Sequence, residues 1–157
     1  MKAQPGGISL RDIIALEQVG VDRFRANVHQ TNHTGSVFGG SLLAQAVRAA
    51  ELTADDRALH SLHAYFYRGM TTKTPIDIVI ERTRDGGSFS SRRVTAWQDG
   101  KLGFEALMSL HIAEEGFAHV CAWTSPPPPP AMVPTLLEFA EALGVSNGAQ
   151  SGPPIGA

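Results

Sequence analysis

The hydrophobic and polar positions change their period along the first third of the chain. Residues 9–20 (SLRDIIALEQVG) have the spacing of a short amphipathic helix, with Ser9 as its N-cap and Gly20 at its end. Residues 21–30 alternate instead, which predicts a strand. The apolar side of this strand consists of Phe24, Ala26 and Val28.

The central part of the chain predicts one long helix and four further strands. Residues 39–52 repeat apolar positions at helical spacing, and the stripe consists of Leu42, Leu43, Ala46, Val47 and Ala50. Alternating segments then cover residues 60–68, 76–84, 88–98 and 102–113. The Asp-Gly dipeptides in RDGGS and QDGK are hairpin signals between the last three segments. We interpret the four segments as an antiparallel meander, so the predicted class is α+β, with one sheet wrapped around one helix.

The pattern changes after Ala113. Five consecutive prolines, at positions 126–130, predict a stiff extended spacer. We therefore expect one domain over residues 1–125 and a proline-rich linker and tail over residues 126–157, with one short helix at 135–144.

Composition narrows the functional classes. The 157 residues are 43% hydrophobic and 18% charged, which is typical of a globular domain. A net charge of −2 gives no electrostatic reason to expect a nucleic acid or an anionic membrane as partner. The only cysteine, Cys121, suits a reducing compartment, and the first residues lack an apolar signal segment. We expect a cytoplasmic protein.

The stretch HTGSVFGGSLLAQAV, residues 33–47, places two glycines directly before the long helix. It is no phosphate loop, because Gly40 is followed by Ser41 and Leu42 where a Walker motif has Lys and Ser or Thr. Two interpretations remain. The glycines allow close packing against the sheet, or the N–H groups at the helix start also polarise a thioester carbonyl.

Four segments carry a resemblance to a known family. They are VFGGSLLAQAVRAA, LHSLHAYFYRG, TPIDIVIERTRDGGSFSSRRVTAWQDGK and EALMSLHIAEEGFAH. In order and spacing they resemble the N-terminal half of the TesB-like acyl-CoA thioesterases. The resemblance implies a hotdog fold, hydrolysis of medium- and long-chain acyl-CoA, and no cofactor. Members usually carry Gln where Ser41 stands, whereas Gln45 is kept.

The resemblance also implies that something is missing. Family members have two hotdog halves, and their catalytic Asp, Ser or Thr, and Gln lie in the second. The corresponding places in this chain fall near Leu43, Leu59 and Met108, which cannot activate water. The sequence also has no Asp or Glu between Thr31 and Ala50. We expect an acyl-CoA thioesterase module that needs a second hotdog half or another copy of itself; the alternative is a non-catalytic domain that binds acyl-CoA or a protein partner.

Eight residues are candidates for the site. If the chain holds a catalytic group of its own, we expect His60 or His63, although each could simply bond a neighbour. The two lie three apart on a predicted strand, so we expect opposite faces and no shared metal. The candidates for substrate binding are Phe38, Gly39, Gly40, Gln45, Arg92 and Arg93. The two arginines should also face opposite sides, and a solvated or ion-paired arginine is the alternative to a contact with coenzyme A phosphates.

Overall fold

The computed structural model describes residues 8–122 and 124–144. The chain divides into two compact units between Glu114 and Glu115. The domain boundary expected after residue 125 stays a prediction. The tail residues 145–157 lie outside the described part of the chain.

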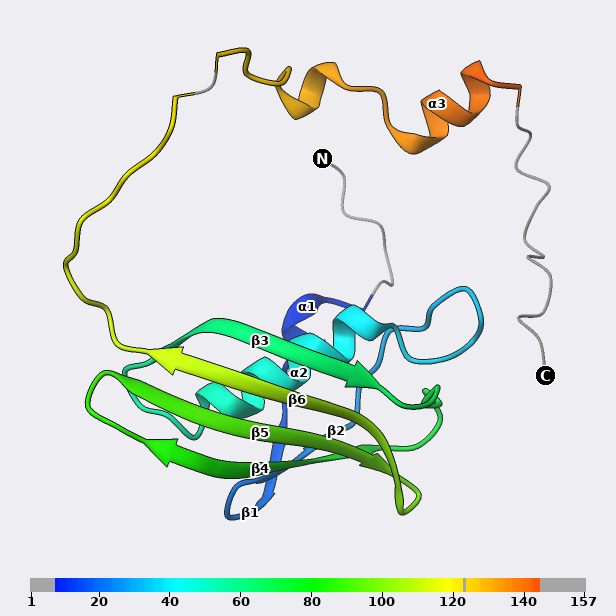
Figure 1. Ribbon diagram of the computed structural model, residues 1–157. Coiled ribbons are helices and arrows are strands. Elements are labelled where there is room, and N and C mark those ends of the chain that lie inside the picture. Colours follow the sequence, from blue (N-terminus) through cyan, green and yellow to red (C-terminus); the bar gives the residue numbers. More distant parts are fainter. Residues whose placement is uncertain (1–7, 123, 145–157) are drawn as a thin grey trace. The chain divides into compact units, whose positions relative to one another are not determined.

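The first unit is built on one six-stranded sheet in the order β1-β2-β4-β5-β6-β3 (Figure 1). Every neighbouring pair of strands is antiparallel. The strands are β1 (Glu17–Gly20), β2 (Arg23–Ala26), β3 (Ala58–Phe66), β4 (Ile76–Asp85), β5 (Phe89–Gln98) and β6 (Lys101–His111). β3 therefore forms one edge of the sheet and β1 forms the other.

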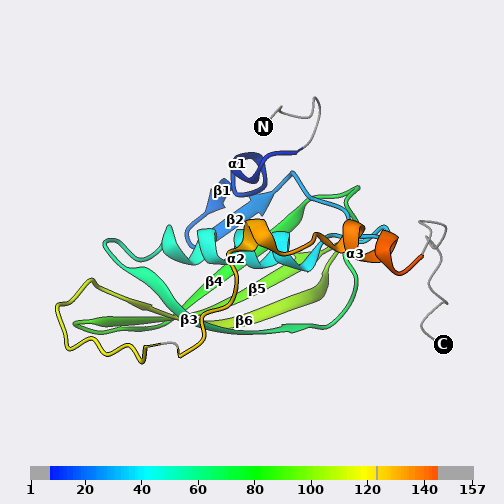
Figure 2. The same ribbon diagram turned by 90° about the horizontal axis from the view of Figure 1, so that it is seen from above.

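One long helix, α2 (Gly39–Glu51), packs against one face of this sheet, here called the inner face (Figures 1 and 2). Strand side chains alternate between this face and the opposite, outer face. The largest apolar side chains that are fully buried in the core are Phe104, Ile76, Ile78 and Leu110. Burial of each contributes roughly 1.5–3 kcal/mol in transfer terms. The helix contributes Leu42 and three alanines to this core, so it lies close to the strands.

The start of the chain differs from the expected single helix. Ser9 does cap a helix, but α1 covers only Leu10–Ile13, and Gly20 ends strand β1 instead. Strand β1 pairs with β2, so the backbone hydrogen bonds of residues 17–20 are made within the sheet. That pairing outweighs the weak helical preference of the segment.

The two Asp-Gly signals are confirmed. Asp99 and Gly100 both have positive φ (50° and 73°) and join β5 to β6 by a two-residue turn. The prediction of a four-stranded meander was wrong for its first strand, because β3 pairs with β6 and not with β4. No hairpin signal stands between β3 and β4, and the longer connection carries the chain across the sheet.

The second unit contains a 3-10 turn, Pro130–Met132, and helix α3, Leu136–Ala142. Thr135 and Glu138 form a capping box at the start of α3. This helix lies within the stretch 135–144 in which the sequence predicts one. In the two described ranges, no helix combines the length and the apolar character needed to cross a bilayer.

Candidate active site

Helix α2 begins without a side-chain cap. Its N-cap residue, Phe38, has an extended backbone (φ −65°, ψ 129°), and its carbonyl accepts hydrogen bonds from the N–H groups of Ser41 and Leu42 at 2.9 and 3.3 Å. Within residues 8–122 and 124–144, no group accepts a hydrogen bond from the N–H of Gly39 or Gly40. Two donors at the positive end of the helix dipole are thus available to a bound group.

Two phenylalanine rings lie close to Gly39 and Gly40. A Cβ placed on Gly40 would lie 2.5 Å from Cε1 of Phe38, and one on Gly39 would lie 3.3 Å from Cε1 of Phe66. Position 40 therefore accepts a side chain only if the Phe38 ring moves. Phe38 and Phe66 are 47% and 52% exposed, so their rings also form part of the surface. The packing interpretation and the chemical interpretation of the glycine turn are compatible.

No carboxylate accompanies the turn. The first turn of α2 holds no acidic residue. The nearest acidic residues along the helix, Glu51, Asp55 and Asp56, lie at its opposite end, where they line a hollow of about 650 Å³ together with His60 and His111. A general base for water is thus missing at the donors, as far as the described residues extend.

Gln45 belongs to α2, and its side chain is fully buried. Its Nε2 donates to the carbonyls of Val28 and Ile13, at 2.8 and 3.1 Å. Gln45 therefore ties the helix to the segments that follow β2 and end α1. Since its amide donors are used inside the protein, we leave Gln45 out of the proposed substrate contacts.

Polar atoms without a partner gather around Gln45. In the described part of the chain, four buried side-chain atoms here make no hydrogen bond: Gln45 Oε1, Ser41 Oγ, His29 Nε2 and Thr74 Oγ1. His29 approaches Gln45 at 3.5 Å through its other ring nitrogen. Burial lowers the pKa of His29, and the backbone of Thr74 opposes that shift only in part. The neutral form of this imidazole is thus favoured by folding.

We expect His29 to make the fold sensitive to acid. When the pKa of a histidine is lower in the folded than in the unfolded chain, the protein becomes less stable as the pH falls below about 6.5. The free energy of unfolding then decreases by up to about 1.4 kcal/mol per pH unit. Urea denaturation at pH 7.5 and 5.5 should show this loss in the wild type and a smaller one in His29→Gln. His33→Gln, which replaces an exposed histidine, should keep the wild-type slope. Equal slopes in all three proteins would contradict the assignment.

Arg92 lies on the inner face and is 1% exposed. It donates to Thr53 twice, from Nε to Oγ1 and from Nη2 to the carbonyl, each at 2.9 Å, and forms an ion pair with Asp85 at 2.7 Å. Its Nη1 donates to the carbonyls of Arg84 and Ser91. The Ser90 hydroxyl and then Arg92 hold the pKa of the Asp85 carboxyl below its usual value.

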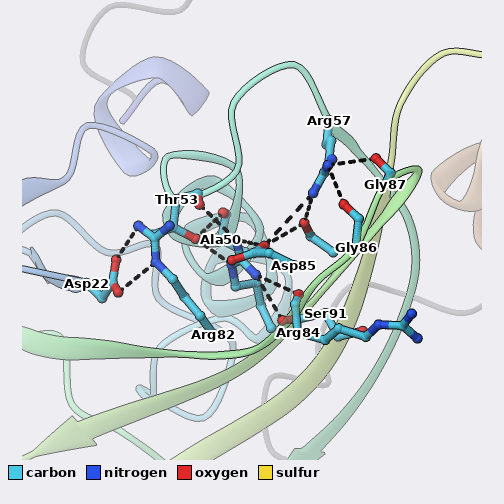
Figure 3. Close-up of polar contacts among 12 residues, drawn as sticks. Asp22, Ala50, Thr53, Arg57, Arg82, Arg84, Asp85, Gly86, Gly87 and Ser91 are labelled. Atoms are coloured by element: carbon cyan, nitrogen blue, oxygen red, sulfur yellow. Dashed lines mark hydrogen bonds and ion pairs between the residues drawn. The ribbon is translucent and has the colours of Figure 1, made fainter.

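The surrounding network joins the end of α2 to the β4–β5 turn (Figure 3). Arg57, which stands just before β3, donates to the carbonyls of Gly86 and Gly87, both at 2.8 Å. Arg82 pairs with Asp22 at 2.8 Å at the side of the same cluster. All donors of Arg92 are occupied within the protein, so we assign Arg92 a structural role and leave it out of the proposed substrate contacts.

Arg93 lies on the outer face, so the two arginines do point in opposite directions, as the alternation predicted. Its guanidinium pairs with Glu105 at 2.7 Å and with Glu81 at 3.5 Å. Arg93, followed by the Tyr67 hydroxyl, holds the pKa of Glu105 below its usual value. Arg93 is therefore an ion-paired arginine, the alternative to a contact with coenzyme A phosphates.

His60 and His63 do not lie on opposite faces, and that expectation was wrong. A β-bulge between Leu59 and Ser61 shifts the register of β3 against β6. His63 stands opposite Leu107 on the outer face, and His60 Nε2 contacts Ser109 Oγ of the same face at 3.0 Å. Both candidate catalytic histidines thus lie on the side of the sheet away from α2. No group of three metal-ligating side chains occurs among the described residues.

Sequence reasoning missed Phe66 and Arg57. The sequence indicates only that Phe66 belongs to an alternating strand. Its proximity to Gly39 depends on where β3 lies relative to the helix. The turn chemistry around Arg57 gave no sign that its guanidinium binds two carbonyls of a distant hairpin. The aromatic run Tyr65-Phe66-Tyr67 was the one available signal, because three consecutive large side chains on a sheet edge cannot all be buried.

An antiparallel sheet packed around a single long helix defines a hotdog domain, and the uncapped glycine start of that helix is a candidate binding feature. Solved structures bear out the fold. The TesB protein of Mycobacterium avium subsp. paratuberculosis matches with a TM-score of 0.67 and 34% identity, over 76% of this chain and 48% of that one. Acyl-CoA thioesterase II TesB2 of Mycobacterium marinum matches with a TM-score of 0.68 and 37% identity, over 83% and 48%.

The sequence model of the acyl-CoA thioesterase N-terminal domain matches residues 28–111. The chain belongs to this family. A curated relative, human acyl-coenzyme A thioesterase 8, is 38% identical over 119 residues, which are 74% of this chain and 37% of the relative. The chain thus spans less than half the length of the curated relatives it matches.

Proposed function

We propose that this chain is one half of an acyl-CoA thioesterase and that the N–H groups of Gly39 and Gly40 bind the thioester carbonyl. The observation that carries the proposal is the pair of N–H donors at the start of α2 to which the described residues offer no acceptor. A carbonyl oxygen placed there gains negative charge when water attacks its carbon. Two N–H donors and the helix dipole stabilise that charge more than they stabilise the ground state.

The base that activates water is proposed to come from a second hotdog half. Within the described residues, no carboxylate lies in the first turn of α2. Of the two edge strands, β3 is the one at which the second half would pair, because it carries Tyr65 and Phe66, which are 57% and 52% exposed. The Phe66 ring also lies close to Gly39, so a strand added beside β3 would bring its own side chains close to the donors.

A second candidate function is a non-catalytic domain that binds acyl-CoA. The same donors would then hold a thioester that is not cleaved, and the missing carboxylate favours this alternative. Medium- and long-chain acyl-CoA remains the proposed substrate class, on the strength of the family resemblance. The cytoplasm remains the proposed location, on the strength of composition and the single cysteine.

The test is thiol release from dodecanoyl-CoA by the purified chain, alone and mixed with the separately expressed second half of a TesB-type relative. We expect the chain alone to be slow, with kcat/KM well below about 10⁴ M⁻¹s⁻¹, and the mixture to be faster by orders of magnitude. Binding of dodecanoyl-CoA without turnover in either case would favour the non-catalytic alternative. No binding at all would refute both functions.

The two outer-face histidines provide a further check in the same assay. His60→Ala and His63→Ala should each keep the wild-type rate within about twofold, because neither side chain lies on the face of α2. A loss of 100-fold or more in either variant would show that a histidine acts in the reaction, which would relocate the site to the outer face.

A further inference from the structure

The surroundings of the two donors indicate which part of the substrate they receive. Phe66 is held in place by an edge-to-face contact with Phe104, whose ring centroid lies 5.1 Å away and which is fully buried. The Phe38 ring occupies space that Gly40, with no Cβ, leaves free at the first turn of α2. One ring thus lies beside Gly39 and the other beside Gly40.

Each ring leaves about half of its surface in water. Phe38 is 47% exposed and Phe66 is 52% exposed. Water cannot satisfy this apolar surface, and covering it with methylene groups is favourable by about 25 cal/mol per Å². A pantetheine arm is a poorer occupant than a hydrocarbon chain, since its two amides would lose water against aromatic faces that offer no strong hydrogen-bonding group.

We propose that Phe66 and Phe38 form the seat for the first methylene groups of the acyl chain and so determine the preference for acyl-CoA over free coenzyme A. This inference rests on the proposed function, because the thioester carbonyl would be bound by the donors of Gly39 and Gly40, the two residues beside which the rings lie. Methylene groups next to a carbonyl held there lie within reach of both aromatic faces. The seat belongs entirely to this half of the enzyme, whereas the base for water does not.

The experiment measures equilibrium binding of free CoA, butyryl-CoA, octanoyl-CoA and dodecanoyl-CoA to the full 157-residue chain. Phe66→Gln removes the apolar ring surface and keeps a side chain of similar length, and Phe38→Ala is a second variant at a surface position. Phe89→Ala is the matched control, since Phe89 is 47% exposed and begins β5, on the far side of the sheet from α2. Circular dichroism checks that each variant is folded.

We expect the Kd of all three acyl-CoAs to rise about tenfold in Phe66→Gln, and several-fold in Phe38→Ala. Free CoA should bind all proteins equally, and Phe89→Ala should match the wild type. An equal loss for free CoA and acyl-CoA would place pantetheine against the rings and overturn the proposal. Unchanged acyl-CoA binding in both variants would overturn it as well. If Phe66→Gln does not fold, Phe38→Ala decides between the same outcomes.

The proposed function fails in a different way. If the wild-type chain binds dodecanoyl-CoA no better than free CoA, it has no acyl-thioester site, and the proposed aromatic seat is refuted as well. If the wild type prefers dodecanoyl-CoA and the variants keep the full preference, the proposed thioester site stands and only the aromatic seat is refuted. The two failures are therefore read from different proteins in one titration.

Discussion

Replacement of Arg92 by methionine is expected to lower the free energy of unfolding by about 3 kcal/mol. Methionine keeps much of the volume but none of the donors, so the carbonyl of Thr53 loses the Arg92 donor inside the core and its hydroxyl keeps only the bond that it donates to Ala50. The Asp85 carboxylate also loses its closest cation, but it is 47% exposed and regains water. The loss of stability thus comes mainly from buried acceptors that no longer have a donor.

The neighbouring position provides a matched control. Arg93→Met makes the same chemical change on the outer face, where the guanidinium is 46% exposed and pairs with Glu105 and Glu81. Exposed ion pairs contribute at most about 1 kcal/mol, so this variant should stay close to the wild type. Urea denaturation of both variants checks the pair. Similar losses in the two would show that Arg92 is not the structural link between helix and hairpin.

The second large effect is expected at Gly39. Replacement by proline removes one N–H donor, and proline is well accepted at the first position of a helix. The preceding residue, Phe38, already has the extended backbone that a residue before proline prefers. In the thioesterase assay with the second half present, Gly39→Pro should reduce kcat by about 100- to 1000-fold, the effect of losing one oxyanion donor.

Gly39→Ala separates the donor from the space around it. Alanine keeps the N–H and places a methyl group at the position where proline has its Cβ, 3.3 Å from the Phe66 ring. We expect a loss of less than about tenfold, because the ring has to move by only a few tenths of an ångström. If alanine and proline reduce kcat equally, crowding against Phe66 explains the effect, and the N–H of Gly39 has no part in the reaction.

The sequence predicts those parts of the fold that depend on local pattern. Helix α2 begins at Gly39 as expected, since apolar spacing and the glycine turn both depend on near neighbours. The Asp99–Gly100 turn follows from the positive φ that these residues accept. The place of β3 beside β6 could not be read in this way, because the pairing joins segments that are about forty residues apart, such as His63 and Leu107.

The candidate site was predicted in part for the same reason. The glycine donors lie in one contiguous stretch, and the sequence shows both the helix start and the missing carboxylate. The bulge that brings His60 and His63 to one face is an irregularity in the pairing of two strands, so it cannot be read from one segment alone. The burial of Arg92 depends on Thr53, just after α2, and Asp85, at the end of β4, both reaching its guanidinium, which alternation alone does not reveal.

The position of β3 at the sheet edge has a consequence for how the chain reaches its folded state. Strands β4, β5 and β6 follow one another directly, and a two-residue turn closes β5 on β6. Such local hairpins form in about 1–10 μs, whereas closing a long loop requires more entropy to be lost first. We expect β3 to join the sheet after this hairpin, since it precedes all three strands in the chain and pairs with the last of them. A nascent chain therefore has to complete β6 before its third strand finds a partner.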